Sequence, residues 1–249
     1  MRFTLLLLFA TCAAVACGQE SSKQPGGGSA VATPEGGTSA SADGGDAGIA
    51  PSGPSYCTML DPAPFFCVDF EDGATPDKRF TRAFGATNED GALRVTDTED
   101  GAYVAQEADP VPHWTVIQLG FTVRPVTLPT DGRLVIARIG QHQTDLECRL
   151  DLELNGDVAA LGGSGATSAT LTWKPRVSET ARIVLALEEQ TDGGMLRGTV
   201  TVDGKQATSA PVMLGCARLP GPPRVLLGRI NASGATDLRY DDIVMDGRE

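Results

Sequence analysis

The chain has 249 residues and a formal net charge of −12, from 32 acidic and 20 basic side chains. A surface this acidic repels phosphate groups, so the charge argues against nucleic acid as a partner and against binding to anionic headgroups. Aromatic residues make up only 5% of the chain, and many of its 30 Gly and 16 Pro lie in the N-terminal quarter. This composition predicts a globular domain preceded by a segment without a core.

Residues 1–16 predict a secretory signal peptide. Arg2 provides the basic start, residues 4–10 (TLLLLFA) are mostly apolar, and small residues follow at positions 13–16. The apolar run is too short to cross a bilayer as a helix, but it has the length of a signal-peptide core. We therefore expect an exported protein.

The stretch Ala14-Val15-Ala16-Cys17 resembles a lipobox, where signal peptidase II cuts before a cysteine that becomes acylated. The resemblance implies that Cys17 is the lipidation site of an outer-membrane or cell-surface lipoprotein. Such a protein meets the membrane only through its lipid anchor. Cys12 fits the same pattern less well. The alternative is ordinary cleavage after Ala16, which would release a secreted or periplasmic protein.

Residues 17–55 comprise the candidate lipidated cysteine and a linker rich in Gly, Ser, Pro and Ala. The linker has no aromatic residue, and its only branched aliphatic residues are Val31 and Ile49. It cannot bury enough apolar area to offset backbone entropy, so we expect it to be disordered. A Gly-rich coil of this length spans on the order of 35 Å on average, which suits a tether.

From residue 56 onward, short runs of alternating apolar and polar residues predict an all-β domain. Turn signals such as Asn155-Gly156 and Asp203-Gly204 separate several of the runs. The expected strands are 65–70, 92–96, 102–106, 114–124, 133–139, 146–154, 157–161, 169–173, 182–188, 196–203, 224–230 and 237–246. About a dozen strands with hairpin connections imply two stacked antiparallel sheets, a β-sandwich.

Four segments carry a resemblance to a known fold family. They are 66–73 (FCVDFEDG), 121–125 (FTVRP), 200–205 (VTVDGK) and 240–246 (YDDIVMD). In this order and spacing they resemble the strands of concanavalin A-like (laminin-G-like) domains, and the resemblance implies a jelly roll over residues 56–249. With the lipobox and linker, the chain resembles lipoproteins of myxobacterial type.

Four cysteines remain once the two in the N-terminal region are set aside. An even number of cysteines in an exported chain predicts two disulfides, for which three connectivities are open. We expect Cys57–Cys67, which closes a short loop at the entrance to the domain, and Cys148–Cys216, between distant segments. A metal site or a reactive thiol is the alternative, but the sequence has no C-x-x-C spacing to support it.

Acidic residues at both ends of the domain suggest a structural metal. In concanavalin A-like and related jelly-roll modules, the first and last strands are neighbours and their carboxylates often hold Ca²⁺. The resemblance implies Glu71, Asp72, Asp241 and Asp242 as ligands of a structural calcium ion, which prefers six to eight oxygen ligands. The alternative is four solvated acids on strand ends.

The expected strand 146–154 alternates charged and apolar residues. Alternation places Glu147, Arg149, Asp151 and Glu153 on one face and the leucines on the other. Laminarinase-type glycosidases of this fold carry E-x-D-x-E on a central strand, where the outer acids act as nucleophile and general acid. Arg149 stands where the middle acid would be needed. We therefore expect a solvent-facing side with charge pairs and no catalytic residue.

The remaining candidates are isolated. Trp114 is our candidate ligand-binding residue, because tryptophan can stack on sugar rings, whereas we expect Trp173 to pack against the core. His113 and His142 are expected in loops. The sequence contains no Gly-rich phosphate loop, G-x-S-x-G elbow or H-E-x-x-H motif.

These observations lead us to expect a surface-anchored lipoprotein with a non-catalytic sandwich that binds glycan or another extracellular ligand, a polysaccharide or a surface protein. The first alternative is a structural or interaction protein of the envelope with no small ligand. The second is a glycoside hydrolase or polysaccharide lyase. Fold analogy does not choose among them, because one fold hosts many functions.

Overall fold

The computed structural model describes residues 55–96, 101–108, 114–130, 132–140, 148–166, 168–191, 195–216, 222–230 and 234–248. The expected signal peptide, Cys17 and nearly all of the linker lie outside these residues. None of the described helical segments has the length and apolar composition of a membrane span.

The described elements are two short helical segments and sixteen strands. In chain order they are η1 (Tyr56–Met59), β1 (Phe66–Val68), α1 (Pro76–Arg79), β2 (Arg82–Phe84), β3 (Ala86–Glu89), β4 (Ala92–Thr96), β5 (Ala102–Glu107), β6 (Val116–Thr127), β7 (Leu134–Gly140), β8 (Arg149–Asn155), β9 (Val158–Gly163), β10 (Ala169–Thr170), β11 (Ala181–Glu188), β12 (Arg197–Val202), β13 (Lys205–Gln206), β14 (Val212–Met213), β15 (Arg224–Ile230) and β16 (Asp237–Arg248).

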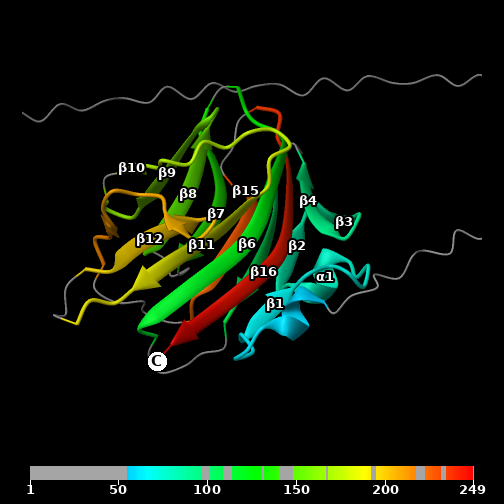
Figure 1. Ribbon diagram of the computed structural model, residues 1–249, viewed down its shortest axis with the longest axis horizontal. Helices are drawn as coiled ribbons and strands as arrows, with labels where there is room; N and C mark the ends of the chain where they lie inside the picture. Colours follow the sequence, from blue (N-terminus) through cyan, green and yellow to red (C-terminus); the bar gives the residue numbers. More distant parts are fainter. Residues whose placement is uncertain are drawn as a thin grey trace, which may run out of the picture. The chain divides into compact units, whose positions relative to one another are not determined.

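The strands form two antiparallel sheets that pack face to face (Figure 1). The nine-stranded sheet has the order β13-β12-β11-β6-β16-β4-β3, with β1 also paired to β16 and β14 to β12. The seven-stranded sheet has the order β10-β9-β8-β7-β15-β5-β2. This confirms the predicted two-sheet β-sandwich.

Alternating side chains build the core between the sheets. On β8, Leu150, Leu152 and Leu154 are fully buried, and β11 and β12 show the same every-second-residue burial. Near the middle of the sandwich, the buried Tyr240 hydroxyl on β16 donates a hydrogen bond to the Ile136 carbonyl on β7 at 3.0 Å. This bond joins the two sheets inside the core.

The first and last strands are neighbours, as the resemblance implied. β1 pairs with β16 through Phe66–Met245, Cys67–Val244 and Val68–Ile243. Farther along β16 the pairing with β6 shifts at a β-bulge, where Asp242 adopts a positive φ of 49°. A bulge changes the direction of side chains locally. Here inward and outward side chains alternate along β16 as far as Tyr240 and Asp241, and the alternation is interrupted at Asp242.

The disulfides have the expected pairing. Cys57 bonds Cys67 across 10 residues, and Cys148 bonds Cys216 across 68 residues. The first fastens η1 to β1. The second joins the residue preceding β8, in the seven-stranded sheet, to the segment after β14, in the nine-stranded sheet.

Candidate functional site

The outer face of the seven-stranded sheet carries charged groups that are not exposed to solvent. Arg149, Asp151 and Glu153 point away from the core on β8, as alternation predicted. However, Asp151 is only 3% exposed and Glu153 only 5%. The expected charge pairs are present, but the expectation that these carboxylates face solvent is wrong, because Arg138 on β7 and Arg133 just before β7 pair with them and cover them.

Asp151 is held by two arginines. Arg138 on β7 donates to it from Nε at 2.6 Å and from Nη2 at 3.2 Å, and Arg149 Nε lies 3.3 Å from the second carboxylate oxygen. Planar guanidinium groups match both oxygens of a carboxylate, so such pairs are strong and geometrically specific. The carboxylate therefore fixes the orientation of two guanidinium groups on the sheet face.

Glu153 is held in a similar way by Arg133, whose pKa is raised chiefly by the hydrogen bond to Glu153. The glutamate lies over Gly162 of β9, where an added Cβ would be 3.1 Å from Glu153 Oε1. A side chain at position 162 would crowd the carboxylate, so glycine leaves the room that this pair occupies.

The charged side chains of this face lie in two neighbouring rows, and in the second row Gly140 stands between two arginines. One row crosses the strands as Ala105, Leu226, Arg138, Asp151 and Gly162, and the next as Glu107, Arg224, Gly140 and Arg149. An added Cβ at Gly140 would lie 2.7 Å from the Cys148 carbonyl oxygen. Glycine within a strand often marks a place where a ligand approaches the backbone closely.

Arg224 is a largely buried cation whose Nε lacks a hydrogen bond among the described residues. The residue is 9% exposed. Glu107 is its nearest carboxylate, with Oε1 3.7 Å from Nε, and the Glu107 side chain is largely exposed. A buried donor left without a partner costs free energy, so this group is a natural place for an anion to bind. We call the surface of Arg138, Arg149, Arg224, Asp151 and Glu153 the arginine face.

Aromatic side chains lie beside the arginine face on the same sheet. Phe84 on β2 and Tyr103 on β5 pair across the strands with ring centroids 6.1 Å apart. Tyr103 also pairs with Gly228 on β15, where an added Cβ would be 2.7 Å from the tyrosine Cα. Exposed rings, small residues and guanidinium groups together suit a sugar chain that carries negative charge.

Sequence reasoning recognised β8 but missed the residues that complete this face. Arg138 and Arg224 stand in otherwise apolar runs, residues 134–140 (LVIARIG) and 224–230 (RVLLGRI). The signal in the sequence that could have identified them is a single arginine within an otherwise apolar strand. Glu147, which we considered with Asp151 and Glu153, lies outside the described residues.

The predicted calcium ligands are partly brought together. Asp241 and Asp242 lie on β16, next to the strand after which Glu71 and Asp72 follow, but Asp72 pairs with Arg79. Burial raises the pKa of Asp241 to about 6, and repulsion from Asp242, Glu71 and Asp69 adds to the shift. Among the described residues no group of three or more His, Cys, Asp or Glu is arranged to hold a metal ion. The calcium site stays a prediction.

Trp114 packs against other residues of its own end of the sandwich. Its ring centroid lies 5.4 Å from that of Phe65, and the indole covers Gly247, where no Cβ would fit. Its role in ligand binding stays a prediction. Trp173 is partly buried against the core, as expected. The positions of His113 and His142 lie outside the described residues.

Comparison with known proteins shows the fold. No protein-family model and no curated protein matches the chain. Among solved structures, the alginate lyase Aly36B with an alginate trisaccharide matches at 14% identity and a TM-score of 0.52, over 74% of this chain and 98% of the lyase. The receptor-binding domain of botulinum neurotoxin type G matches at 9% identity and a TM-score of 0.50, over 75% and 48%.

These structures correct our functional expectation. We expected a non-catalytic module and no enzyme, but the lyase is matched over nearly its whole length and the neurotoxin domain over about half. The comparison therefore favours the alternative of a polysaccharide lyase or glycoside hydrolase. The sequence analysis weighed catalysis through carboxylates on β8. The same face also carries arginines from β7 and β15, which that reasoning did not include. At these identities the likeness shows a jelly-roll fold related to the concanavalin A-like one.

Proposed function

We propose that the protein is an enzyme that cleaves an acidic polysaccharide, and that the arginine face binds its substrate. The observation that carries the proposal is the buried guanidinium group of Arg224, beside Arg138 and Arg149 around Gly140. Its Nε has no hydrogen bond among the described residues, and its carboxylate partner Glu107 lies 3.7 Å away with a largely exposed side chain. A chain with a net charge of −12 gathers cations here, and a uronate carboxylate can pair with Arg224. The solved alginate lyase of the same fold supports this substrate class.

The residues favour a lyase over a hydrolase. A retaining or inverting hydrolase needs two carboxyl groups that flank the glycosidic bond. Asp151 and Glu153 are instead buried and bound to arginines, so they serve to orient cations. In a lyase reaction on a uronate, guanidinium groups neutralise the sugar carboxylate and thereby acidify the neighbouring C–H bond.

Elimination then needs a proton acceptor and a proton donor. The C–H bond beside the carboxylate breaks, the electron pair forms a C=C bond, and the glycosidic C–O bond on the next carbon breaks. The departing oxygen takes up a proton, so atoms and charge balance. We assign Tyr103 to proton transfer, because its phenol lies on the same face and can both accept and donate a proton.

The test is an assay of the purified protein on alginate, polygalacturonate and hyaluronan. Elimination creates an unsaturated sugar end that absorbs in the ultraviolet, whereas hydrolysis creates only new reducing ends. We expect ultraviolet-absorbing product from at least one of the three polymers. Reducing ends without absorbance would show a hydrolase, and no product from any polymer by a folded protein would overturn the proposal.

Variants then locate the site. Arg224→Gln and Tyr103→Phe should each lower kcat/KM at least about a hundredfold, since each removes a group that acts on the transition state. The matched control is Arg248→Gln at the end of β16, in the other sheet, which should retain the activity of the native chain. Full activity in both site variants would place catalysis elsewhere.

We also propose that the enzyme is a surface lipoprotein anchored through Cys17 and connected by the linker 17–55. The support is the lipobox and linker composition of the sequence. Cys17→Ser should move the protein from the membrane fraction to the soluble fraction and abolish incorporation of labelled palmitate. Unchanged fractionation and unchanged palmitate labelling would contradict the proposed membrane anchoring. On sequence grounds we also propose a laminin-G-like relationship and a structural calcium ion.

A further inference from the structure

A hollow of about 350 Å³ lies where β11 begins and where the hairpin of β12 and β13 turns. This volume falls within the range of small-ligand sites. The side chains that concern us are Trp173, Lys174, Arg176, Glu179, Thr180 and Asp203. None of them belongs to the arginine face, so the hollow is a separate feature.

One wall of the hollow is the segment 171–180, which connects β10 to β11 and is fastened to the strands at both ends. The Thr172 backbone N–H donates to the Ala207 carbonyl at 2.8 Å, and the Ser178 backbone N–H donates to the Pro125 carbonyl on β6 at 2.7 Å. Between these points, the buried Pro175 restricts the backbone further. A wall fixed in this way is in place before a ligand arrives, which lowers the ordering cost of binding.

The opposite wall is the turn of the β12–β13 hairpin. Asp203 and Gly204 have positive φ values of 51° and 74°, which a tight hairpin turn of this kind requires. The Asp203 backbone N–H donates to the Arg182 carbonyl at 2.8 Å, and the Arg182 N–H donates back to Asp203 Oδ1 at 2.9 Å. The carboxylate is therefore held in place at the start of β11. Its Oδ2 has no hydrogen bond among the described residues and is available as an acceptor.

Trp173 is the aromatic side chain of the hollow. It packs against the core and also lines the hollow, so the ring is anchored and still accessible. Its indole N–H has no hydrogen bond in the described part of the chain and, unlike that of Trp114, is not fully buried. A tryptophan with this placement offers a flat apolar surface next to polar groups, which suits stacking on a sugar ring.

The charges around the hollow cancel. Arg176 and Glu179 pair with each other at 3.3 Å, and the charge of Lys174 is matched by that of Asp203. Lys174 and the Thr180 hydroxyl have no hydrogen bond or ion pair among the described residues. A lining without net charge does not favour an ionised ligand, in contrast to the arginine face. It offers both donors and acceptors, which suits hydroxyl groups, because each hydroxyl can donate and accept.

We propose that this hollow binds a neutral sugar residue of a glycan, with Trp173 stacked on the sugar ring. The Lys174 ammonium group donates to hydroxyl oxygens, Asp203 Oδ2 accepts from a hydroxyl, and the Thr180 hydroxyl can do either. The proposal does not depend on the enzymatic function, because the hollow and the arginine face share no residue.

The experiment uses the fluorescence of Trp173. The chain contains two tryptophans, so Trp114→Phe leaves Trp173 as the only indole. This variant is titrated with three neutral oligosaccharides, cellotetraose, mannotetraose and laminaritetraose, and with the acidic tetragalacturonate. We expect at least one neutral oligosaccharide to change the fluorescence, with a Kd of about 1 mM or lower, and tetragalacturonate to bind this site at least about tenfold more weakly.

Calorimetry on the native chain checks the same Kd. A fluorescence change with none of the three neutral oligosaccharides, in a protein shown to be folded by circular dichroism, would overturn the proposal. Tetragalacturonate binding at Trp173 as tightly as the best neutral oligosaccharide would overturn it as well, since the hollow would then select for charge.

Two variants test the polar groups. Lys174→Ala should weaken binding of the neutral oligosaccharide about tenfold. Asp203→Asn keeps the turn and the acceptor for the Arg182 N–H but replaces the free acceptor with a donor, so it should weaken binding severalfold. The matched control is Lys205→Ala, an exposed lysine on β13 outside the hollow, which should bind normally. Equal effects of Lys174→Ala and Lys205→Ala would contradict the assignment.

Arg224→Gln separates this proposal from the enzymatic one. It should abolish cleavage of the acidic polymer and leave binding of the neutral oligosaccharide unchanged, because Arg224 lies on the arginine face. Loss of neutral oligosaccharide binding in folded Arg224→Gln would contradict a separate site. Cleavage that fails while Trp173 still reports binding would remove the enzymatic proposal alone.

Discussion

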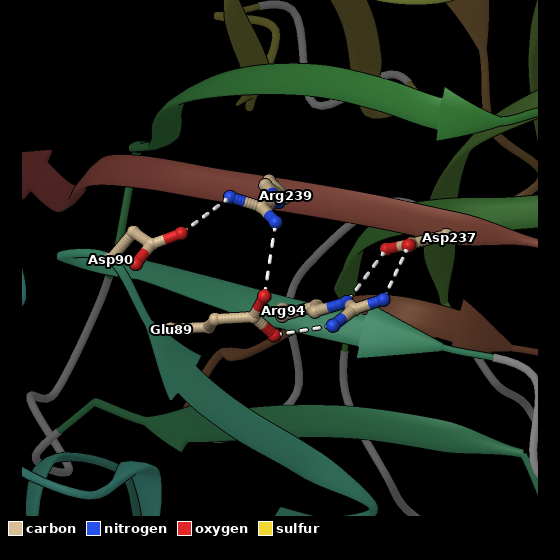
Figure 2. A network of polar contacts seen from close by, with 5 residues as sticks. All are labelled: Glu89, Asp90, Arg94, Asp237 and Arg239. Atoms are coloured by element: carbon tan, nitrogen blue, oxygen red, sulfur yellow. Dashed lines mark hydrogen bonds and ion pairs between the residues drawn. The ribbon is translucent and has the colours of Figure 1, made fainter.

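The two outer faces of the sandwich use the same chemistry at different depths. On the arginine face, Asp151 is almost inaccessible beneath Arg138 and Arg149. On the nine-stranded sheet, the network of Glu89, Asp90, Arg94, Asp237 and Arg239 in Figure 2 is more exposed, with the side chains of Asp90 and Glu89 77% and 37% exposed. Each face sets arginines against carboxylates of neighbouring strands.

This difference decides what each face tolerates. Removing either the carboxylate or the arginine of a buried ion pair leaves the other charge away from water without compensation. This destabilises the fold. Exposed pairs contribute little, because water and salt replace them. We therefore expect the charge pairs of the arginine face to contribute more to stability than those of the other face.

The largest expected effect concerns the disulfide that holds the strand at the base of the arginine face. Replacing Cys148 and Cys216 with Ser removes a 68-residue link between the sheets and should lower the free energy of unfolding by about 4 kcal/mol. The control pair is Cys57 and Cys67, whose 10-residue loop should contribute about 3 kcal/mol. Denaturant titration measures both. A larger loss from the shorter loop would contradict this order.

The direct test of the comparison removes one carboxylate from each face. Asp151→Ala leaves the largely buried guanidinium group of Arg138 without its carboxylate partner and should lower the free energy of unfolding by about 3 kcal/mol. Asp90→Ala, which breaks an exposed ion pair with Arg239 on the other face, should lower it by less than about 1 kcal/mol. Urea titration of both variants at one pH measures the two losses in the free energy of unfolding. Equal losses would mean that burial does not distinguish the two faces.

The smallest effect sharpens the account of the exposed face. In the folded state the pKa of Asp241 is about 6, above its ordinary value of 3.8. As the pH rises from about 4 to about 6 the unfolded chain ionises first, so folding loses stability, and above about 6 the loss is constant. Because the group is half-exposed, we expect Asp241→Asn to gain roughly 1 kcal/mol at neutral pH and nothing near pH 4. An equal gain in stability at neutral pH and near pH 4 would contradict this assignment of the raised pKa to Asp241.

The predictable part of the fold came from local patterns. Alternating leucines at 150, 152 and 154 identified β8, and Asp203-Gly204 identified a hairpin that the structure confirms, with both residues at positive φ. Strands β2 and β3 were missed, because residues 82–84 (RAF) and 86–89 (ATNE) show no apolar alternation and pair only at sheet edges.

The site was less predictable, because its properties arise between strands. The burial of Asp151 depends on Arg138, 13 positions away, and that of Glu153 on Arg133, 20 positions away. The pairing of β16 with β6 also shifts at a bulge after Asp241, which no turn residue in the sequence predicts. Charges on one strand can be read from sequence, but the partner that covers them is set by sheet register.

The position of β16 has a consequence for how the protein is made. This strand comes last in the described chain, yet it lies inside the nine-stranded sheet, between β6 and β4, and also pairs with β1. The sheet cannot close until residues 237–248 have emerged from the ribosome, so this sheet cannot be completed stepwise during synthesis. Until then the unpaired edges of β4 and β6 are open to association between nascent chains, and the pairings that end this state are long-range and slow to form.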